Sequence, residues 1–165
     1  MAKSITSANS VLTITATSRG VATGIANATG SSALASLSGA LGVPNTLQGW
    51  SADNAFSIDA QTVGVVVQGV DGRTHSGWVP HLVLFNVSLM PDSDSQDYLE
   101  SLVTAQDMMR ETFLITGALL IPSIAKKYSL SNGTITSYTP IPQHGRVLAA
   151  QNMTITFSSI SPAVY

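Results

Sequence analysis

Residues Val11–Thr17 read V-L-T-I-T-A-T, and the stretch from Met153 to Ile160 opens with M-T-I-T-F. In both stretches apolar side chains alternate with hydroxyl side chains, which is the period of a strand with one buried face. Threonine suits the uncovered face because its branched Cβ fits a pleated sheet while its hydroxyl bonds water or a neighbour. The two stretches therefore predict strands that are apolar on one side and rich in threonine on the other.

Further strand-like segments lie between these two. Residues 50–61 and 62–70 are strand-like segments, and the second is nearly all valine and glycine. Asp71-Gly72 follows, a pair that tolerates the positive backbone angles of a tight turn. The chain then returns through residues 79–90, which are apolar at both odd and even positions, so we expect this strand to lie between two layers.

The C-terminal third contains a second turn signal. Asn132-Gly133 separates the segment 118–130 from the segment 134–138, and Asn-Gly between two such runs is typical of a two-residue hairpin turn. We therefore predict a hairpin that turns at Ser131-Asn132-Gly133. A proline-containing connection then leads to a short strand over residues 147–150.

One segment has the pattern of a helix. Ser93 followed three residues later by Gln96 fits a capping box, and Asp94, Asp97 and Glu100 place negative charge at the positive end of the helix dipole. We expect the helix to end at about Thr112. Its apolar face consists of Leu99, Leu102, Val103, Met109 and Phe113.

Many short strands with one helix and frequent turns predict a mainly β (α+β) fold, an antiparallel sandwich- or barrel-like domain with one flanking helix. The 165 residues suffice for one domain, 1–165, because a compact chain of this length hides about 70% of its unfolded surface. The sequence has no cysteine, so disulfides and thiolate metal sites are excluded and a reducing cytoplasm is the default compartment.

The low charge is the most unusual property of the composition. Only 10% of the residues are charged, against about 25% in a typical soluble domain, while 44% are hydrophobic. We infer that much of the exterior is buried against other subunits, as in obligate assemblies. The alternative is a monomer whose surface is covered by serine and threonine.

Residues 20–50 form a tract without any charged residue, dominated by Gly, Ala, Ser, Thr and Asn. Disordered segments usually combine charge with few apolar residues, whereas this tract has leucines at intervals. We interpret it as a long loop or hairpin that becomes ordered by packing on another subunit. The alternative is a flexible linker.

Several functional classes do not fit. A net charge of −2 without a basic stripe argues against a dedicated nucleic-acid binder. The apolar run 113–125 is shorter than the roughly 20 residues of a membrane-spanning helix, and the N-terminus has no apolar core of a secretory signal.

Motifs for catalysis are also missing. His75, His81 and His144 have no metal-ligand spacing, and the sequence around Ser31 and Ser76 fails the nucleophile-elbow pattern. No glycine-rich phosphate loop occurs, and helix capping already explains the acidic residues near Asp94. We therefore expect a protein that is not an enzyme, with no catalytic, metal or cofactor site.

Five motifs follow one another along the chain: L-Q-G-W (Leu47–Trp50), V-D-G (Val70–Gly72), L-I-P-S-I-A-K-K-Y (Leu120–Tyr128), T-S-Y-T-P-I-P (Thr136–Pro142) and the terminal M-T-I-T-F (Met153–Phe157). An acidic lead-in to one helix and an Asn-Gly pair accompany these motifs. The order of these features resembles that of tail tube proteins of contractile-tailed bacteriophages.

This resemblance implies a structural subunit of the virion tail, assembled in the host cytoplasm, that forms hexameric rings stacked into a hollow tube. Genomic DNA passes through the bore without specific binding. The implied partners are further copies of the chain, the sheath protein, the tape measure protein, and the baseplate and tail terminator proteins. The family brings no cofactor.

Two sets of residues follow as candidates. A bore that lets DNA slide needs hydroxyls and acids rather than Lys or Arg, because cations bind phosphates. The candidate bore-lining residues are Thr13, Thr15, Asp59, Asp71, Thr154 and Thr156. The candidate ring-stacking loop contains Ser31, Leu34, Leu37, Leu41 and Val43, and we expect deletion of residues 31–39 to prevent long tubes.

Three alternatives stay open at this point. A tube of a bacteriocin-like or secretion device shares the assembly physics and differs only in carrying no genome. A fibre or receptor-binding module should show repeats or exposed aromatic clusters, which the sequence lacks. A small enzyme would need a preformed polar pocket in a monomer.

Overall fold

The computed structural model describes residues 9–18, 37 and 39–164. Its strands are β1 (Val11–Thr17), β2 (Asn45–Leu47), β3 (Phe56–Ile58), β4 (Gly64–Gln68), β5 (Thr74–Trp78), β6 (Val83–Leu89), β7 (Leu114–Ile121), β8 (Lys126–Tyr138) and β9 (Gln151–Ala163). The helix α3 (Asp94–Met109) and a 3₁₀ turn η1 (Pro122–Ile124) complete the described elements.

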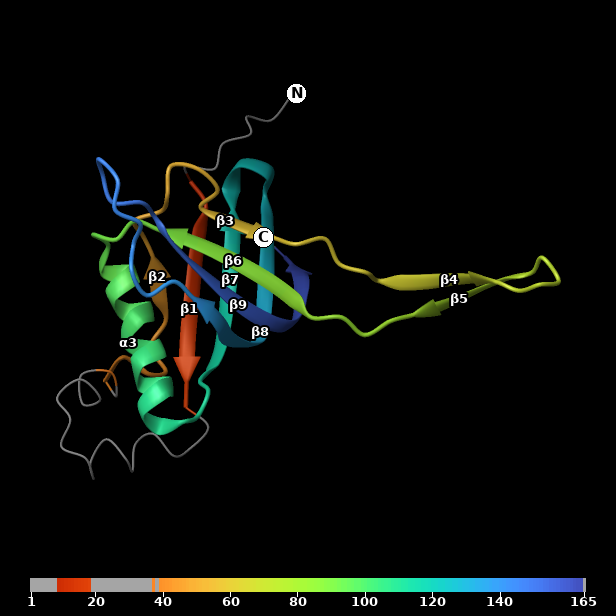
Figure 1. Ribbon diagram of the computed structural model, residues 1–165, viewed down its shortest axis with the longest axis horizontal. Helices are drawn as coiled ribbons and strands as arrows, with labels where there is room; N and C mark the ends of the chain where they lie inside the picture. The colour runs from red at the N-terminus through yellow and green to blue at the C-terminus, as the bar shows by residue number, and fades with distance from the viewer. Residues whose placement is uncertain (1–8, 19–36, 38, 165) are drawn as a thin grey trace.

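Seven strands form one antiparallel sheet in the order β2-β1-β7-β8-β9-β6-β3, and β4 pairs with β5 as a separate two-stranded ribbon. The large sheet curls, so that β6 and β9 run obliquely to β1 and β7, while α3 lies along one side (Figure 1). The prediction of a mainly β, barrel-like antiparallel fold with one flanking helix is therefore confirmed. Because the large sheet curls, strands of this one sheet form the opposing layers of the fold.

The core lies between the concave face of the curled sheet and α3. Alternate residues of each strand face it, as Leu12, Ile14 and Ala16 of β1 show, and Leu99 and Leu102 close it from the helix. At its centre Phe85 stacks on Phe56 at 6.0 Å between ring centroids and meets the edge of Phe157 at 6.0 Å. The strand predictions of residues 11–17 and 153–160 are confirmed with the expected faces.

The start of α3 agrees with the sequence prediction, and its end does not. The Ser93 hydroxyl accepts a hydrogen bond from the Gln96 backbone N–H at 3.1 Å, but the buried Gln96 Nε2 has no partner in the described chain. The cap is thus one half of a capping box. The helix ends at Met109 because Arg110 adopts the left-handed conformation at φ 52°, so the predicted end at Thr112 is wrong.

We expect Ser93→Ala to lower the free energy of unfolding by about 1 kcal/mol, because the Gln96 N–H loses its side-chain acceptor and keeps only the Ser93 carbonyl at 2.9 Å. Chemical denaturation of the purified chain measures this. Ser88→Ala, on the open face of β6, is the matched control and should be neutral. Equal stability of the two variants would contradict the role of Ser93.

Hydrogen bonds from the L-Q-G-W motif, at the end of the edge strand β2, hold this strand against the start of α3. The Gln48 N–H donates to Ser95 Oγ at 2.8 Å, and the Met90 N–H donates to the Gly49 carbonyl at 2.8 Å. Gly49 has a φ of +75°, and a Cβ at this position would collide with the side chain of Ser93. Glycine is required here by both backbone angle and space.

The predicted turn at Ser131-Asn132-Gly133 is wrong, because these residues lie inside the continuous strand β8. Asn132 has the positive φ typical of an Asn-Gly turn, 52°, but it lies in a β-bulge. Ile115 pairs with Gly133 and Gly117 pairs with Leu130, so β8 contains one more residue than β7 between these two pairs. The hairpin turns instead at η1, where the Ala125 N–H donates to the Pro122 carbonyl at 3.0 Å.

Other segment predictions are confirmed in part. Asp71-Gly72 does turn a hairpin, with Gly72 at φ +77° and the Gly69 N–H donating to the Arg73 carbonyl at 2.8 Å. Residues 147–150 form no strand, since only one isolated bridge joins Leu148 to His144. Of residues 50–61, three form the strand β3.

Candidate self-assembly surfaces

The ribbon of β4 and β5 projects away from the sheet and α3 as a long arm (Figure 1). We call residues 64–78 the valine hairpin. All ten strand residues of this hairpin are exposed. An isolated two-stranded ribbon is marginally stable at best in water, so this hairpin is a candidate for packing against another chain.

Both faces of the valine hairpin are apolar. The pairing sets Val65 opposite Gly77 and Val67 opposite His75 on one face, and Val66 opposite Ser76 on the other. The exposed fractions of the three valines are 46%, 59% and 66%. Small residues of β5, Gly77 and Ser76, lie opposite Val65 and Val66, so β5 does not cover these valines. The hairpin therefore exposes an apolar surface on each of its two faces.

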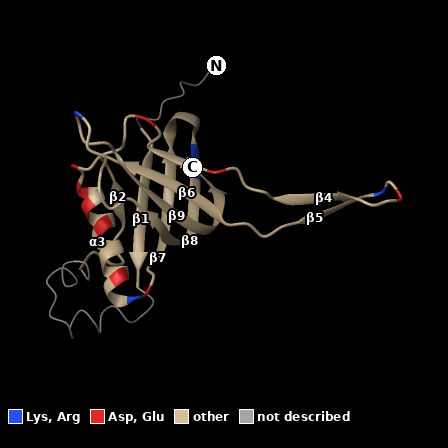
Figure 2. Cartoon of the chain, viewed as in Figure 1, with Lys and Arg blue, Asp and Glu red and all other residues tan. Residues whose placement is uncertain are grey.

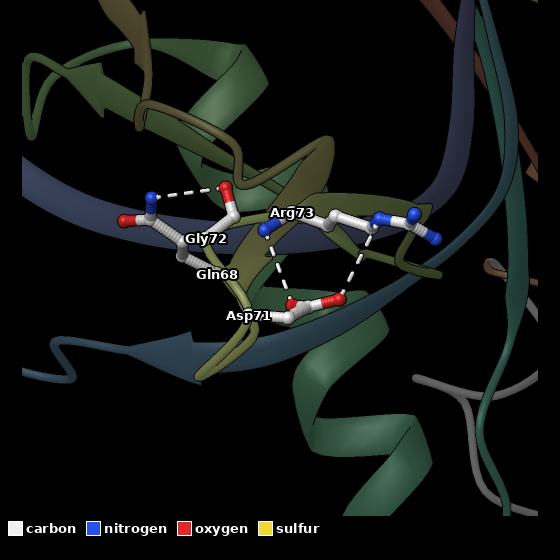
Figure 3. Close-up of polar contacts among 4 residues, drawn as sticks. All are labelled: Gln68, Asp71, Gly72 and Arg73. Carbon is white, nitrogen blue, oxygen red and sulfur yellow. Dashed lines mark hydrogen bonds and ion pairs between the residues drawn. The ribbon is translucent and has the colours of Figure 1, made fainter.

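Charge on the hairpin is confined to its tip. Asp71 accepts the Arg73 backbone N–H at 3.2 Å and pairs with Arg73 Nε at 3.7 Å, while Gln68 Nε2 donates to the Gly72 carbonyl at 3.3 Å (Figure 3). The exposed ion pair contributes little to stability, but it neutralises the turn locally. The strands behind the tip carry no charge.

The second surface is the face of the curled sheet opposite the core, which we call the threonine face. The register places Thr13 opposite Thr46, Thr15 opposite Thr116, and Thr156 opposite Thr134. Hydroxyls bond across the strands, as between Thr13 and Thr46 at 3.3 Å. These pairs make a hydroxyl surface that spans β2, β1, β7, β8 and β9.

The threonine face continues onto β6 and the end of β3. Thr154 Oγ1 donates to Asn86 Oδ1 at 2.8 Å, and Asn86 Nδ2 donates to Asp59 Oδ1 at 3.4 Å. The structure thus brings five of the six candidate bore residues to one face. It separates the sixth, Asp71, which lies at the hairpin tip (Figure 3).

Charges avoid the sheet almost completely (Figure 2). The seven strands of the large sheet contain two charged residues, Lys126 and Lys127 at the start of β8. By register Lys127 lies at one end of the threonine face, opposite Leu120 and Ala163. Acidic side chains gather along α3 instead, on the other side of the sheet (Figure 2).

The third surface is a hollow of about 470 Å³ at the mouth of the curled sheet, which we call the apolar hollow. It is lined by residues of β3, β7, β8 and β9, strands that the curl brings together. The lining residues are Phe56, Ser57, Ile58, Leu119, Ile121, Tyr128, Ile160 and Pro162. None of them is charged.

Of the candidate ring-stacking residues, Ser31 and Leu34 lie outside the described residues. Leu37 is buried in the core of its own subunit, and Leu41 packs partly against that core. The Leu41 N–H donates to the Leu37 carbonyl at 3.0 Å, as in a helical turn. Val43 is 54% exposed and is the described member that is free to meet a neighbour.

No group of three His, Asp or Glu side chains within the described part of the chain could hold a metal ion. Burial raises the pKa of Tyr98, and burial followed by the charge of Glu100 raises the pKa of Tyr138, so both phenols are neutral at physiological pH. Among the described helices, none has the length and hydropathy to cross a bilayer.

A protein-family comparison adds the decisive observation. Residues 25–161 match the family model described as tail fiber protein gp32, which is most of the chain. The chain belongs to the gp32 tail fiber protein family. This membership confirms the resemblance to phage tail proteins and gives the chain a structural role in the tail. No curated protein sequence matched it.

Solved structures of contractile injection systems resemble this family member. A chain of the anti-feeding prophage baseplate aligns with a TM-score of 0.51 and 10% identity over 99% of this chain and 98% of that chain. A chain of the sheath/tube terminator complex of an extracellular contractile injection system aligns with a TM-score of 0.49 and 11% identity over 98% and 97%. The first likeness shows a shared fold.

Two features of these surfaces were not predicted from the sequence. Residues 62–70 were predicted to turn at Asp71-Gly72 and to return through residues 79–90, but the structure returns them through β5, so that β4 and β5 form a free arm while residues 83–89 form β6 of the large sheet (Figure 1). One face of β6 is buried and the other is partly or fully exposed, so the prediction that this strand lies between two layers is wrong. The apolar hollow depends on the curl of the sheet and involves strands far apart in sequence. No local signal separated this arm from a buried strand, because a run of three valines is apolar on both faces in either case.

Proposed function

We propose that the chain is the subunit of a tail tube, in which copies form hexameric rings that stack into a hollow conduit for genome ejection. The observation that supports this most directly is the valine hairpin, an uncharged apolar arm with two uncovered faces. Burial of such an arm against copies of the same chain removes apolar surface from water without an opposing charge penalty. Head-to-tail contacts of this kind close into rings or extend into filaments.

The threonine face lines the bore in this proposal. Hydroxyls and amides hydrate well and attract phosphates weakly, so duplex DNA slides past them without being held. Lys127, at one end of the face, is its single positive charge among the described residues. The tape measure protein occupies this bore before the DNA does.

The fold then determines which element lies on the outer wall of the proposed tube. Since α3 covers the apolar face of the sheet, a bore lined by the threonine face places α3 on the outer wall of the tube. The outer wall is the side that the sheath protein wraps, and the tube ends meet the baseplate and tail terminator proteins. The subunit acts by assembly and needs no cofactor or catalytic residue.

This orientation is testable because the chain has no cysteine of its own. We expect Asp107→Cys on α3 to react with a large polymer-linked maleimide in intact assemblies, and Thr156→Cys on the threonine face to stay unreacted. Both variants should react fully after disassembly by denaturant. Free reaction of Thr156→Cys in intact tubes would contradict a bore on that side.

The family description supports a second candidate, a subunit of a tail fibre. A fibre would bury the valine hairpin along a solid bundle and enclose no bore, so a cross-section of the assembly by electron microscopy separates the two. A tube of a bacteriocin-like or secretion device has the same geometry as the proposed tube. It differs in transporting no genome.

A further inference from the structure

The apolar hollow needs an occupant that its own subunit does not supply. Its lining includes Ile58, Tyr128 and Ile160, and none of residues 64–78 contributes to it. The valine hairpin of the same chain projects away from the body of the curled sheet, whose strands line the hollow (Figure 1). An open, uncharged apolar concavity is a candidate site for contact with another chain.

An open sheet edge lies beside the hollow. The pairing between β6 and β9 ends at Val83 opposite Phe157, whereas β9 continues to Ala163 with β8 on its other side. From Ser158 onward, β9 therefore has no strand partner on that side within the described chain. Pro162 in this segment fits an edge position, because proline cannot donate to a neighbouring strand. An unpaired edge accepts an added strand.

The chemistry of the occupant follows from the hollow and the edge together. It must be extended, apolar and uncharged, since the lining has no charge to balance. Strand β4 has these properties, with three exposed valines, no charge and one free edge of its own. Its five residues fit within the six residues of the open part of β9.

We propose that β4 of the valine hairpin of one copy docks in the apolar hollow of a second copy, beside the open edge of β9. This inference rests on the proposed self-assembly and names the acceptor surface for the arm. One face of β4 enters the hollow, and the opposite face is left for another contact. Each arm therefore bridges two surfaces, which makes assembly cooperative.

Disulfide trapping tests the docking directly in the cysteine-free chain. Ile160→Cys is combined either with Val66→Cys or with Val67→Cys, and assembled protein is oxidised and run on a non-reducing gel. Val66 and Val67 lie on opposite faces of β4, so we expect strong ladders of cross-linked copies from one pair and at least tenfold less product from the other. Each single-cysteine variant should give only background.

Asn152→Cys, on the threonine face and away from the hollow, is the matched control and should not cross-link to either hairpin cysteine. If assemblies form but both Ile160 pairs stay monomeric, or both react equally, the docking site is wrong while the proposed function stands. If the cross-links form inside one chain, the hollow takes its own arm and the inference is overturned. If the parent chain does not assemble, both the inference and the proposed function fail.

Discussion

We expect that replacing residues 64–78 by a two-residue Gly-Ser turn will abolish assembly and leave the subunit folded. The Val79 N–H donates to the Val63 carbonyl at 3.3 Å, so the two ends of the removed hairpin already lie side by side. The strands of the hairpin are exposed, and their loss should change the free energy of unfolding by no more than about 0.5 kcal/mol. Each buried valine contributes about 1.5–3 kcal/mol to a contact, so the loss of three removes most of it.

Sedimentation velocity measures the assembly state, and thermal unfolding measures the fold. A finer variant, in which Val65, Val66 and Val67 are all threonine, keeps the β-ribbon but removes its apolar faces, and we expect it to fail in assembly as well. Gln68→Thr is the control within the same strand and should assemble normally. Tubes of normal length from the shortened chain would show that the arm is not the contact between copies.

The second large effect is expected at Gly133, where β8 passes the ring of Phe157. A Cβ on Gly133 would overlap that ring, and Phe157 is 1% exposed with no room to move. We expect Gly133→Ala to lower the free energy of unfolding by about 1–3 kcal/mol through overpacking. Denaturant unfolding of the subunit gives the value.

Gly77→Ala is the matched control, because Gly77 is also a strand glycine but has no atom within 4 Å of the added Cβ. It should leave the stability of the subunit unchanged. The double variant Gly133→Ala with Phe157→Leu should lose less than the sum of the two single changes, since the smaller side chain relieves the overlap. Equal unfolding of Gly133→Ala and the Gly77→Ala control would rule out the overlap.

Local alternation was sufficient to predict the faces of the large sheet. Thr13 and Thr15 come from one end of the chain and Thr154 and Thr156 from the other, yet each pattern alone identified the uncovered side. Antiparallel register then brings these sides together. The start of α3 was equally predictable, because a serine cap acts within four residues.

The predictions of a turn at Asn132 and of the end of α3 failed because the local sequence is compatible with two different structures. Asn132 does adopt a positive φ, as an Asn-Gly pair favours, but neighbouring β7 and β9 hold the chain straight and absorb the extra residue as a bulge. The end of α3 at Met109 depends on the backbone of Arg110, which no helix-breaking residue marks. Both outcomes are decided by tertiary contacts.

The valine hairpin and the apolar hollow show a different limit. A run such as G-V-V-V-Q is typical of a buried central strand, and in the isolated subunit it is exposed. In the proposed assembly its hydrophobicity serves contacts outside the subunit, which no local pattern specifies. The position of Asp71 at the tip, away from the threonine face, follows from the direction of the same arm.

Electron microscopy of the purified chain at increasing concentration tests the central claim most directly, that copies of the chain cover its uncharged surfaces. The account predicts rings and hollow tubes with an open bore, in which α3 lies on the outer wall. Single particles of one subunit at high concentration, with the valine hairpin still exposed, would contradict it.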